Sequence, residues 1–236
     1  MFRPMLIIGV GGSGGKTLRS MKQAIERRLE TARYEGGIPS CWQFLQIDTT
    51  YDGQEFPPPM LDPYEEFKSV IADGDDYQNI KNKLISRATR PEQQRMMAGW
   101  GIDQCQVEVR NGAGQMRGIG RLVGMADSPN TLKAIEKSIQ KMLSGRQELQ
   151  IVANALGTKK PLVSVPQVFI ISSLGGGSGS GMFIDVAELV KRATPEKWAQ
   201  DSISFLYTPE VFTSIGAAGN SISKNTLGAV NELIAS

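Results

Sequence analysis

The chain has 236 residues, of which 26 are glycine and none is histidine. Without an imidazole the protein cannot contain a Ser-His-Asp triad, a Cys-His dyad, a His-ligated zinc site or an imidazole general base. Lys and Arg number 26 against 24 Asp and Glu, and the resulting net charge of +2 is too even to indicate a nucleic acid or a membrane surface as the partner.

Predicted strands and helices alternate through the first half of the chain. Residues 5–10 (MLIIGV) form a short apolar run before glycine, which is typical of a strand buried on both faces of a parallel sheet. Apolar residues at helical spacing predict a helix over 16–32, and 42–47 (WQFLQI) predicts a second strand. Four prolines within 52–64 indicate a surface loop. The charge-rich stretch from 64 to about 97 predicts one or two peripheral helices.

The second half of the chain continues the alternation. The predicted strands lie at 106–109, 165–174 and 203–207. The predicted helices lie at 131–143, 182–192 and 225–236, and 127–130 (DSPN) supply a turn and cap before the first of them. Alternating strands and helices indicate an α/β fold with a mainly parallel, Rossmann-like sheet and helices on both faces. We expect the whole chain to form one domain.

Two cysteines, Cys41 and Cys105, make no metal-binding spacing and at most one disulfide. We therefore expect reduced thiols in a reducing compartment, with the cytoplasm as the default location. The first residues lack an apolar stretch of signal-peptide length, and no later apolar run approaches the roughly 18 residues needed to cross a bilayer. These patterns predict a cytoplasmic protein that does not insert into membranes.

Fifteen of the glycines lie in three clusters, at 9–15, 112–124 and 175–181. The first cluster matches G-x-G-x-x-G through Gly9, Gly11 and Gly14 between a strand and a helix. Glycines let backbone N–H groups approach a phosphate, and a helix N-terminus adds a favourable dipole. A Walker A loop is excluded because Val10 stands where that motif needs glycine. Asp48 follows Gly14 by 34 residues, which is longer than the usual Rossmann spacing of about 20 and weakens the NAD interpretation.

The third cluster, GGGSGSG, also leads from a buried strand into a helix. Five glycines in seven residues exceed what a turn needs. Two such strand-to-helix turns in one parallel sheet lie on the same edge, at the carboxyl ends of the strands. Both helix N-termini then point into one crevice, as an extended polyphosphate requires.

These motifs together resemble those of the tubulin and FtsZ superfamily. GGGSGSG (175–181) resembles the signature phosphate loop GGG[TS]G[TS]G, and GVGGSGGK (9–16) resembles the opening loop of FtsZ-type proteins, with Lys16 where those commonly carry Asn. GAGQMRGIG (112–120) is similar to the GAGNNWAKG loop of tubulin, and NTLGAVNEL (225–233) to its NATLSVHQL helix. The resemblance implies that residues 1–236 are the nucleotide-binding domain, of tubulin/FtsZ GTPase type, of a bacterial or archaeal tubulin-like protein.

The resemblance also implies a role for each loop. Residues 12–16 would cradle the inner phosphates of GTP or GDP, 112–115 would meet the terminal phosphate, and 177–179 would wrap the phosphate chain from the other side. Asp48 and Thr49 fall where the loop after the second strand approaches the nucleotide and its Mg²⁺. The implied site residues are Gly11, Gly12, Ser13, Gly14, Gly15, Lys16, Asp48, Thr49, Gly112, Ala113, Gly114, Gln115, Gly176, Gly177, Ser178 and Gly179.

Several of these assignments have alternatives. Asp48 is either a ligand of the nucleotide and its metal or a plain turn residue, and Lys16 either neutralises a phosphate or lies exposed on its helix. Arg117 and Arg121, which lie beside the middle loop at 112–115, are either phosphate ligands or solvated side chains. The acidic ribose contact of the family falls on Ile222 in this sequence, with Glu210 as a possible replacement.

The resemblance implies a cytoskeletal GTPase that assembles head to tail into filaments. The long central helix of the family and its acidic, water-activating loop would lie beyond Ser236. We therefore expect this chain to hold the phosphates, and hydrolysis to require the full-length protein and a neighbouring subunit; no catalytic residue is assigned.

Two other functions are consistent with parts of the sequence. A Rossmann-type oxidoreductase or an E1-like adenylating enzyme would use G-x-G-x-x-G but predicts no role for GGGSGSG. A non-catalytic scaffold would keep a tubulin-like fold as an interaction module and would bind a partner without turning over nucleotide.

Overall fold

A computed structural model of the chain describes residues 2–49, 60–69, 76–91, 94, 109, 112–159, 162–214 and 220–235. The strand predicted at 106–109 lies outside the described residues except for Val109. Most of the predicted 52–64 loop and Cys105 also lie outside them.

Five parallel strands form one sheet. They are β1 (Met5–Val10), β2 (Trp42–Asp48), β3 (Glu66–Lys68), β4 (Gln167–Ser173) and β5 (Ile203–Tyr207). Their order across the sheet is β3-β2-β1-β4-β5, and every pair of neighbours is parallel. Met5 stands opposite Trp42 on one side and Gln167 on the other, so the three central strands start level.

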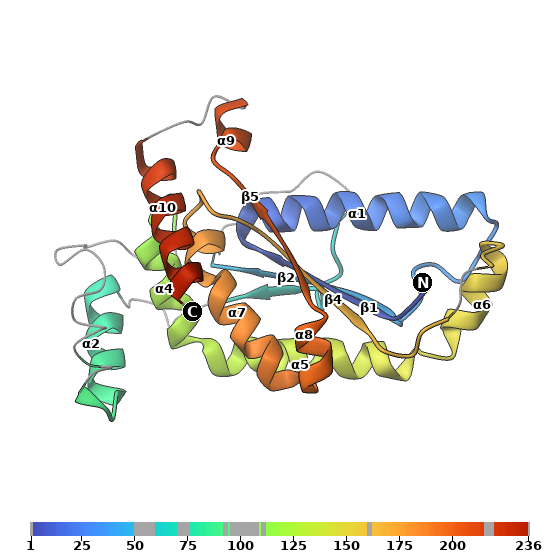
Figure 1. The fold of residues 1–236 in the computed structure, drawn as a ribbon, viewed down its shortest axis with the longest axis horizontal. Helices are drawn as coiled ribbons and strands as arrows, with labels where there is room; N and C mark the ends of the chain where they lie inside the picture. Colours follow the sequence, from blue (N-terminus) through green and yellow to red (C-terminus); the bar gives the residue numbers. More distant parts are fainter. Residues whose placement is uncertain are drawn as a thin grey trace.

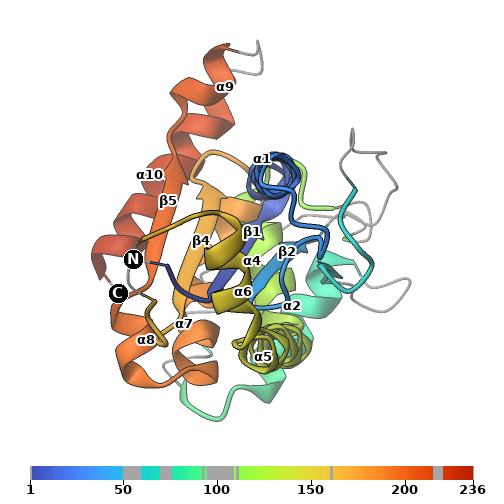
Figure 2. The ribbon, with the colours of Figure 1, turned by 90° about the vertical axis from the view of Figure 1, so that its right-hand side faces the viewer.

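Helices cover both faces of this sheet. They are α1 (Gly11–Thr31), α2 (Tyr77–Arg87), α4 (Arg117–Ala126), α5 (Ser128–Ser144), α6 (Glu148–Ala155), α7 (Ser178–Ala193), α8 (Glu196–Gln200), α9 (Glu210–Ser214) and α10 (Asn220–Ala235). Figure 1 shows α1 on one face of the sheet and α5 and α7 on the other, and Figure 2 shows the same layers end-on. The predicted α/β fold, with a parallel sheet and helices on both faces, is confirmed.

The strand order creates a natural crevice. The chain runs from β1 to β2 on one side of β1 and later places β4 on its other side, followed by β5. The order therefore reverses between β1 and β4. In open α/β sheets ligands bind outside the carboxyl ends of the strands at such a switch point.

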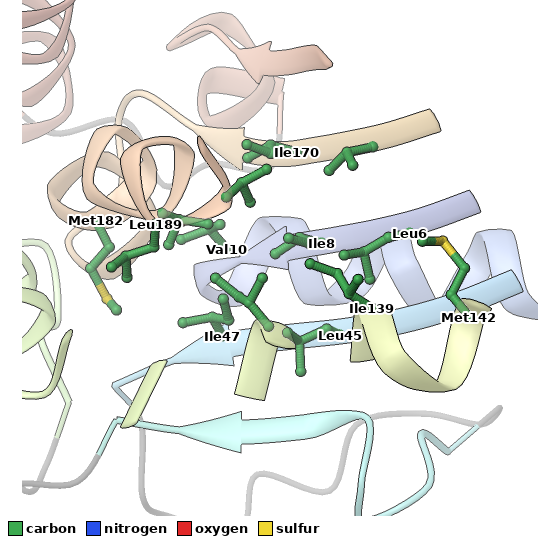
Figure 3. Close-up of a cluster of buried hydrophobic side chains, with 14 residues drawn as sticks. Leu6, Ile8, Val10, Leu45, Ile47, Ile139, Met142, Ile170, Met182 and Leu189 are labelled. Atoms are coloured by element: carbon green, nitrogen blue, oxygen red, sulfur yellow. The ribbon is translucent and has the colours of Figure 1, made fainter. Parts of the chain in front are cut away.

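The core explains why β1 is apolar on both faces. Leu6, Ile8 and Val10 pack into the cluster shared with α5 and α7, which Figure 3 shows. The intervening Ile7 packs with Leu18 of α1 on the opposite face. Because each face of the strand is covered by helices, a continuous apolar run replaces the usual alternation.

Several helices begin earlier than the sequence predicts. α1 begins at Gly11 rather than 16, and α7 at Ser178 rather than 182, so the first and third glycine clusters extend into the first turns of these helices. Glycine is a poor helix former, and here tertiary packing overrides that preference. The predicted turn at 127–130 is likewise the first turn of α5, where a proline is tolerated because its missing N–H would have no helical partner. Similarly, α10 begins at Asn220 rather than 225.

Other elements were not predicted. The stretch expected to be purely helical contains the short edge strand β3 before α2. Helix α4 contains the last three glycines of the middle cluster, and α6 lies between α5 and β4. Cys41 is a buried free thiol, and burial raises its pKa to about 12. Within the described ranges, each helix is too short or too polar to cross a membrane.

Candidate functional site

A cavity of about 370 Å³ opens at the carboxyl edge of the sheet, at the switch point between β1 and β4. Its volume lies within the range of about 300–1,000 Å³ that is common for small-molecule sites. All three glycine clusters contribute to its walls. The lining residues are Val10, Gly11, Gly12, Ser13, Lys16, Asp48, Gly112, Gly114, Gln115, Ser173, Gly176, Gly177, Ser178, Gly179 and Phe212.

Most of the predicted site residues line this cavity, and Gly14, Gly15, Thr49 and Ala113 are the exceptions. Three lining residues were not predicted. Val10 and Ser173 are the last residues of β1 and β4, and the rule that sites form at carboxyl ends of parallel strands could have found them. Phe212 comes from α9, and nothing in the sequence pattern marked it.

The starts of α1 and α7 both face the cavity. Val10 and Gly177 occupy their N-cap positions, and within the described residues neither makes a side-chain capping bond. Neither helix has an acidic residue in its first turn. The first N–H groups of a helix lack intrahelical partners and carry partial positive charge. Two such ends at one cavity form an environment suited to an anion.

Lys16 and Asp48 are the charged side chains among the lining residues. Lys16 is exposed on the first part of α1, within reach of the cavity. Asp48 is buried at the end of β2, and its Oδ1 accepts a hydrogen bond of 2.7 Å from the backbone N–H of Thr49. Asp48 therefore closes a local turn and also borders the cavity.

Thr49 joins the loops instead of lining the cavity. Its side chain is buried, and its hydroxyl shares a hydrogen bond of 2.6 Å with the hydroxyl of Ser178. The same Oγ1 accepts a bond of 3.1 Å from the backbone N–H of Ala113. One side chain after β2 thus connects the middle and third glycine clusters. Thr49 therefore holds the loops together, and its predicted place beside the nucleotide stays a prediction.

Close backbone packing explains part of the glycine excess. Gly11 has a φ of +70°, and a Cβ built there would lie 2.5 Å from the backbone nitrogen of Gly179. A Cβ on Gly177 would collide with the carbonyl oxygen of Gly114. By contrast, a Cβ on Gly12 or Gly176 would meet no atom within 4 Å. These last two glycines border the cavity without any packing requirement.

Gly14 and Gly15 lie close to the sheet and do not themselves line the cavity. A Cβ on Gly14 would collide with the carbonyl oxygen of Ile171 in β4. A Cβ on Gly15 would lie 2.5 Å from side-chain atoms of Gln46 in β2. These two glycines let α1 lie close against the sheet.

Arg117 and Arg121 form ion pairs and do not line the cavity. Arg117 donates two hydrogen bonds, of 2.8 and 2.5 Å, to the carboxylate of Glu232 in α10. Arg121 donates one of 3.1 Å to the same carboxylate and lies 3.2 Å from Asp185 in α7. Both interpretations left open by the sequence are therefore wrong, because the arginines are neither cavity-lining nor solvated.

Burial and the neighbouring charges shift the pKa values of Asp185 and Glu232 in opposite directions. Burial is the main cause that raises the pKa of Asp185 to about 6, against the opposing charge of Arg121. Burial also disfavours the charged form of Glu232, but the hydrogen bond and charge of Arg117 outweigh it and lower its pKa.

The family's ribose position is apolar in this fold. Ile222 is buried, and its Cγ2 would lie 2.6 Å from a Cβ built on Gly175, so it packs beneath the third glycine cluster. Glu210 does not line the cavity. Glu210 is exposed, and hydrogen bonds with Thr208 and with its own backbone lower the pKa of its carboxyl group. Phe212, two residues further on, borders the cavity instead.

A family model described as "Tubulin like" matches residues 6–236. A comparison with curated proteins finds no match. Among solved structures, CetZ2 from Haloferax volcanii, described as a GTPγS-bound protofilament, is 17% identical with a TM-score of 0.43. That alignment covers 96% of this chain and 45% of the other, so the chain spans less than half the length of that protein.

Proposed function

The chain belongs to the tubulin-like family, and on this premise we propose that it binds the phosphate chain of a guanosine triphosphate in the cavity at the carboxyl edge of the sheet. The observation that carries the proposal is the convergence of three glycine clusters, far apart in sequence, on one cavity. Two helix starts without side-chain caps among the described residues, together with Lys16, supply the positive potential that a polyphosphate needs.

We assign each cluster a part of the phosphate chain from the family resemblance. Residues 12–16, at the start of α1, hold the inner phosphates. Residues 112–115 meet the terminal phosphate, and 176–179, at the start of α7, enclose the chain from the opposite wall. Gly12 and Gly176 border the cavity with open space at their Cβ positions, as a backbone that must approach a ligand closely requires.

Mg²⁺ suits this cavity as a partner of the phosphates. In proteins Mg²⁺ usually keeps several waters and takes one or two carboxylates together with substrate phosphates. Asp48 is the carboxylate among the lining residues, and in the part of the chain that the structure describes no cluster of three or more His, Cys, Asp or Glu could hold a metal alone. Asp48 would therefore hold the ion, which neutralises phosphate charge when bound.

The dinucleotide alternative has weaker support. The strand order β3-β2-β1-β4-β5 is also found in dinucleotide-binding Rossmann folds. However, the fingerprint of those proteins uses the first glycine cluster, whereas here Gly176, Gly177, Ser178 and Gly179 also form the cavity wall. A second glycine-rich wall favours a compact triphosphate over an extended dinucleotide.

Assembly and hydrolysis belong to the same proposal. We propose that the full-length protein associates head to tail and that a group from the neighbouring subunit activates the attacking water. Lys16 and Asp48 are the charged residues of the lining, and both are assigned here to the phosphates and their metal ion. Positioning and charge stabilisation then remain the contribution of this chain.

Calorimetric titration of the chain with GTP, ATP and NAD, each with Mg²⁺, tests the binding proposal. We expect GTP to bind most tightly and NAD most weakly. Equal affinity for all three ligands, or no binding of any, would contradict the assignment of the cavity. Light scattering of the full-length protein with GTP and with GDP tests assembly, and two flat, equal traces would count against it.

A further inference from the structure

The start of α10 lies against two of the three glycine loops. The side-chain N–H₂ of Asn225 donates hydrogen bonds of 2.8 Å to the carbonyl oxygen of Gln115 and 3.0 Å to that of Gly175, with a longer contact of 3.4 Å to that of Gly176. One turn earlier, the hydroxyl of Ser221 donates a bond of 2.7 Å to Oε1 of Gln115. One helix face thus bridges the middle loop (112–116) and the third loop (174–177).

The acceptor atoms around Asn225 determine the orientation of its side-chain amide. All three neighbouring atoms are carbonyl oxygens, so the amide nitrogen, not the amide oxygen, must face them. A side-chain amide has two N–H groups, and the two shorter bonds use both of them. In this arrangement Asn225 has no remaining N–H to offer a ligand, and it is not among the residues that line the cavity.

A second contact, an ion pair, attaches the other end of α10 to the rest of the fold. Glu232 lies seven residues after Asn225, about two helical turns along α10. Its carboxylate binds Arg117, which is the first residue of α4 and directly follows the middle loop. Helix α10 is therefore attached both to the two loops and to the helix that continues one of them.

We infer that Asn225 is a positioning residue that sets the spacing between the middle and third loops, and through it the width of the phosphate-binding cavity. The inference rests on the proposed function of that cavity. Gln115 and Gly176 line the cavity, and their backbone carbonyls contact the Asn225 amide. Removing the amide lets the two loops separate without removing any atom that borders the ligand.

Titrations with GTP and with inorganic tripolyphosphate, each with Mg²⁺, test this role in Asn225→Ala. Because the loops hold phosphates, we expect both ligands to bind about tenfold more weakly, which corresponds to about 1.4 kcal/mol. Asn225→Asp places a carboxylate against three carbonyl oxygens and should bind both ligands more weakly still. Asn225→Gln keeps the N–H donors on a longer side chain and should recover part of the affinity.

Glu232→Gln is the matched control at the other end of α10. It loosens the same helix but leaves the two loops bridged, so we expect less than a threefold change in either affinity. Hydrogen exchange without ligand gives a second readout. Asn225→Ala should speed exchange in 112–116 and 174–177, whereas Glu232→Gln should leave these segments as they are in the wild type.

Each outcome bears on the inference. Weaker binding of GTP with unchanged binding of tripolyphosphate would show that Asn225 contacts the nucleoside and would overturn the positioning role. Unchanged binding of both ligands, or equal losses in Asn225→Ala and Glu232→Gln, would also overturn it. If the wild type binds neither ligand, the proposed function itself fails. If Asn225→Ala does not fold, Asn225→Gln and Ser221→Ala provide the same comparison of the two ligands.

Discussion

Replacing Gly12 with alanine distinguishes glycines that border the cavity from glycines that close backbone packing requires. Gly12 lies in the first turn of α1, borders the cavity, and has open space where a Cβ would stand. The fold therefore tolerates a methyl group at this position. We expect the proposed ligand not to tolerate it, because the added methyl group would occupy space in the cavity that a phosphate oxygen needs to approach the backbone.

The expected magnitudes follow from these contacts. Alanine is better than glycine by about 1 kcal/mol in a helix interior and by less in a first turn, so the free energy of unfolding should stay constant or rise by up to about 1 kcal/mol. For a chain of this size such a gain raises the thermal midpoint by at most about 2–4 °C. Losing one hydrogen bond to a charged phosphate costs about 1.5–3 kcal/mol, which weakens GTP binding by about 10- to 150-fold.

Gly14→Ala is the matched control. A Cβ there collides with the carbonyl oxygen of Ile171 and lies 2.8 Å from the carbonyl carbon of Gly9. Both contacts are with backbone, so the neighbouring strands must shift, at a cost of about 1–3 kcal/mol in unfolding free energy. We expect Gly14→Ala to lose stability, in contrast to Gly12→Ala, which keeps its stability and loses affinity.

Thermal unfolding and calorimetric titration with Mg²⁺ and GTP measure both quantities on the same samples. A folded Gly12→Ala variant that binds GTP within twofold of the wild type would refute the reasoning, because the backbone of the first cluster would then not approach the ligand. A Gly14→Ala variant as stable as the wild type would refute the packing argument.

Three further changes have defined outcomes. Lys16→Ala removes the cation of the cavity and should weaken GTP binding about tenfold in calorimetry, because a charge-assisted contact is lost. Thr49→Val leaves the buried N–H of Ala113 without its acceptor and should lower the unfolding free energy by about 1–3 kcal/mol in urea titrations. Burial raises the folded-state pKa of Asp185 from 3.8 to about 6, so the wild type loses stability as pH rises through this interval. Asp185→Asn lacks that loss, and its stability relative to the wild type should rise by up to about 3 kcal/mol between pH 4 and pH 7.

Conservative substitutions distinguish the loss of each specific interaction from a general loss of folded structure. Lys16→Arg keeps the charge and should retain most of the affinity, and a Lys16→Ala variant with full affinity would assign Lys16 to the exposed helix surface. Thr49→Ser keeps the hydroxyl and should keep wild-type stability, so equal losses in the serine and valine variants would contradict the bridging role. Parallel pH–stability curves for Asp185→Asn and the wild type would show that Asp185 does not titrate in this range.

Strands β1 and β5 could be predicted because their signals are local. The predicted bounds of β1 and β5 match the structure, since each is an apolar run that stops at a glycine or just before a proline. Helix starts were predicted less well, because glycine weakens a helix pattern even where packing supports the helix. α7 illustrates this point, since its first turn lies within GGGSGSG.

The candidate site was only partly predictable for a related reason. Gly12 and Gly14 are two residues apart in one motif, yet one borders the cavity and the other packs against β4. Phe212 borders the cavity from α9 without belonging to any motif. These distinctions depend on atoms supplied by distant segments of the chain.

The α/β class, the absence of histidine chemistry and the three glycine clusters that carry the family resemblance could all be read from the amino-acid sequence alone. These features reside in composition and short-range spacing. Three contacts became visible only in the folded chain: Thr49 bridges two loops, Arg117 pairs with Glu232, and Asn225 spans the loops from α10. The partners in these contacts lie between 50 and 129 residues apart, and nothing in the local pattern of either partner specifies the other.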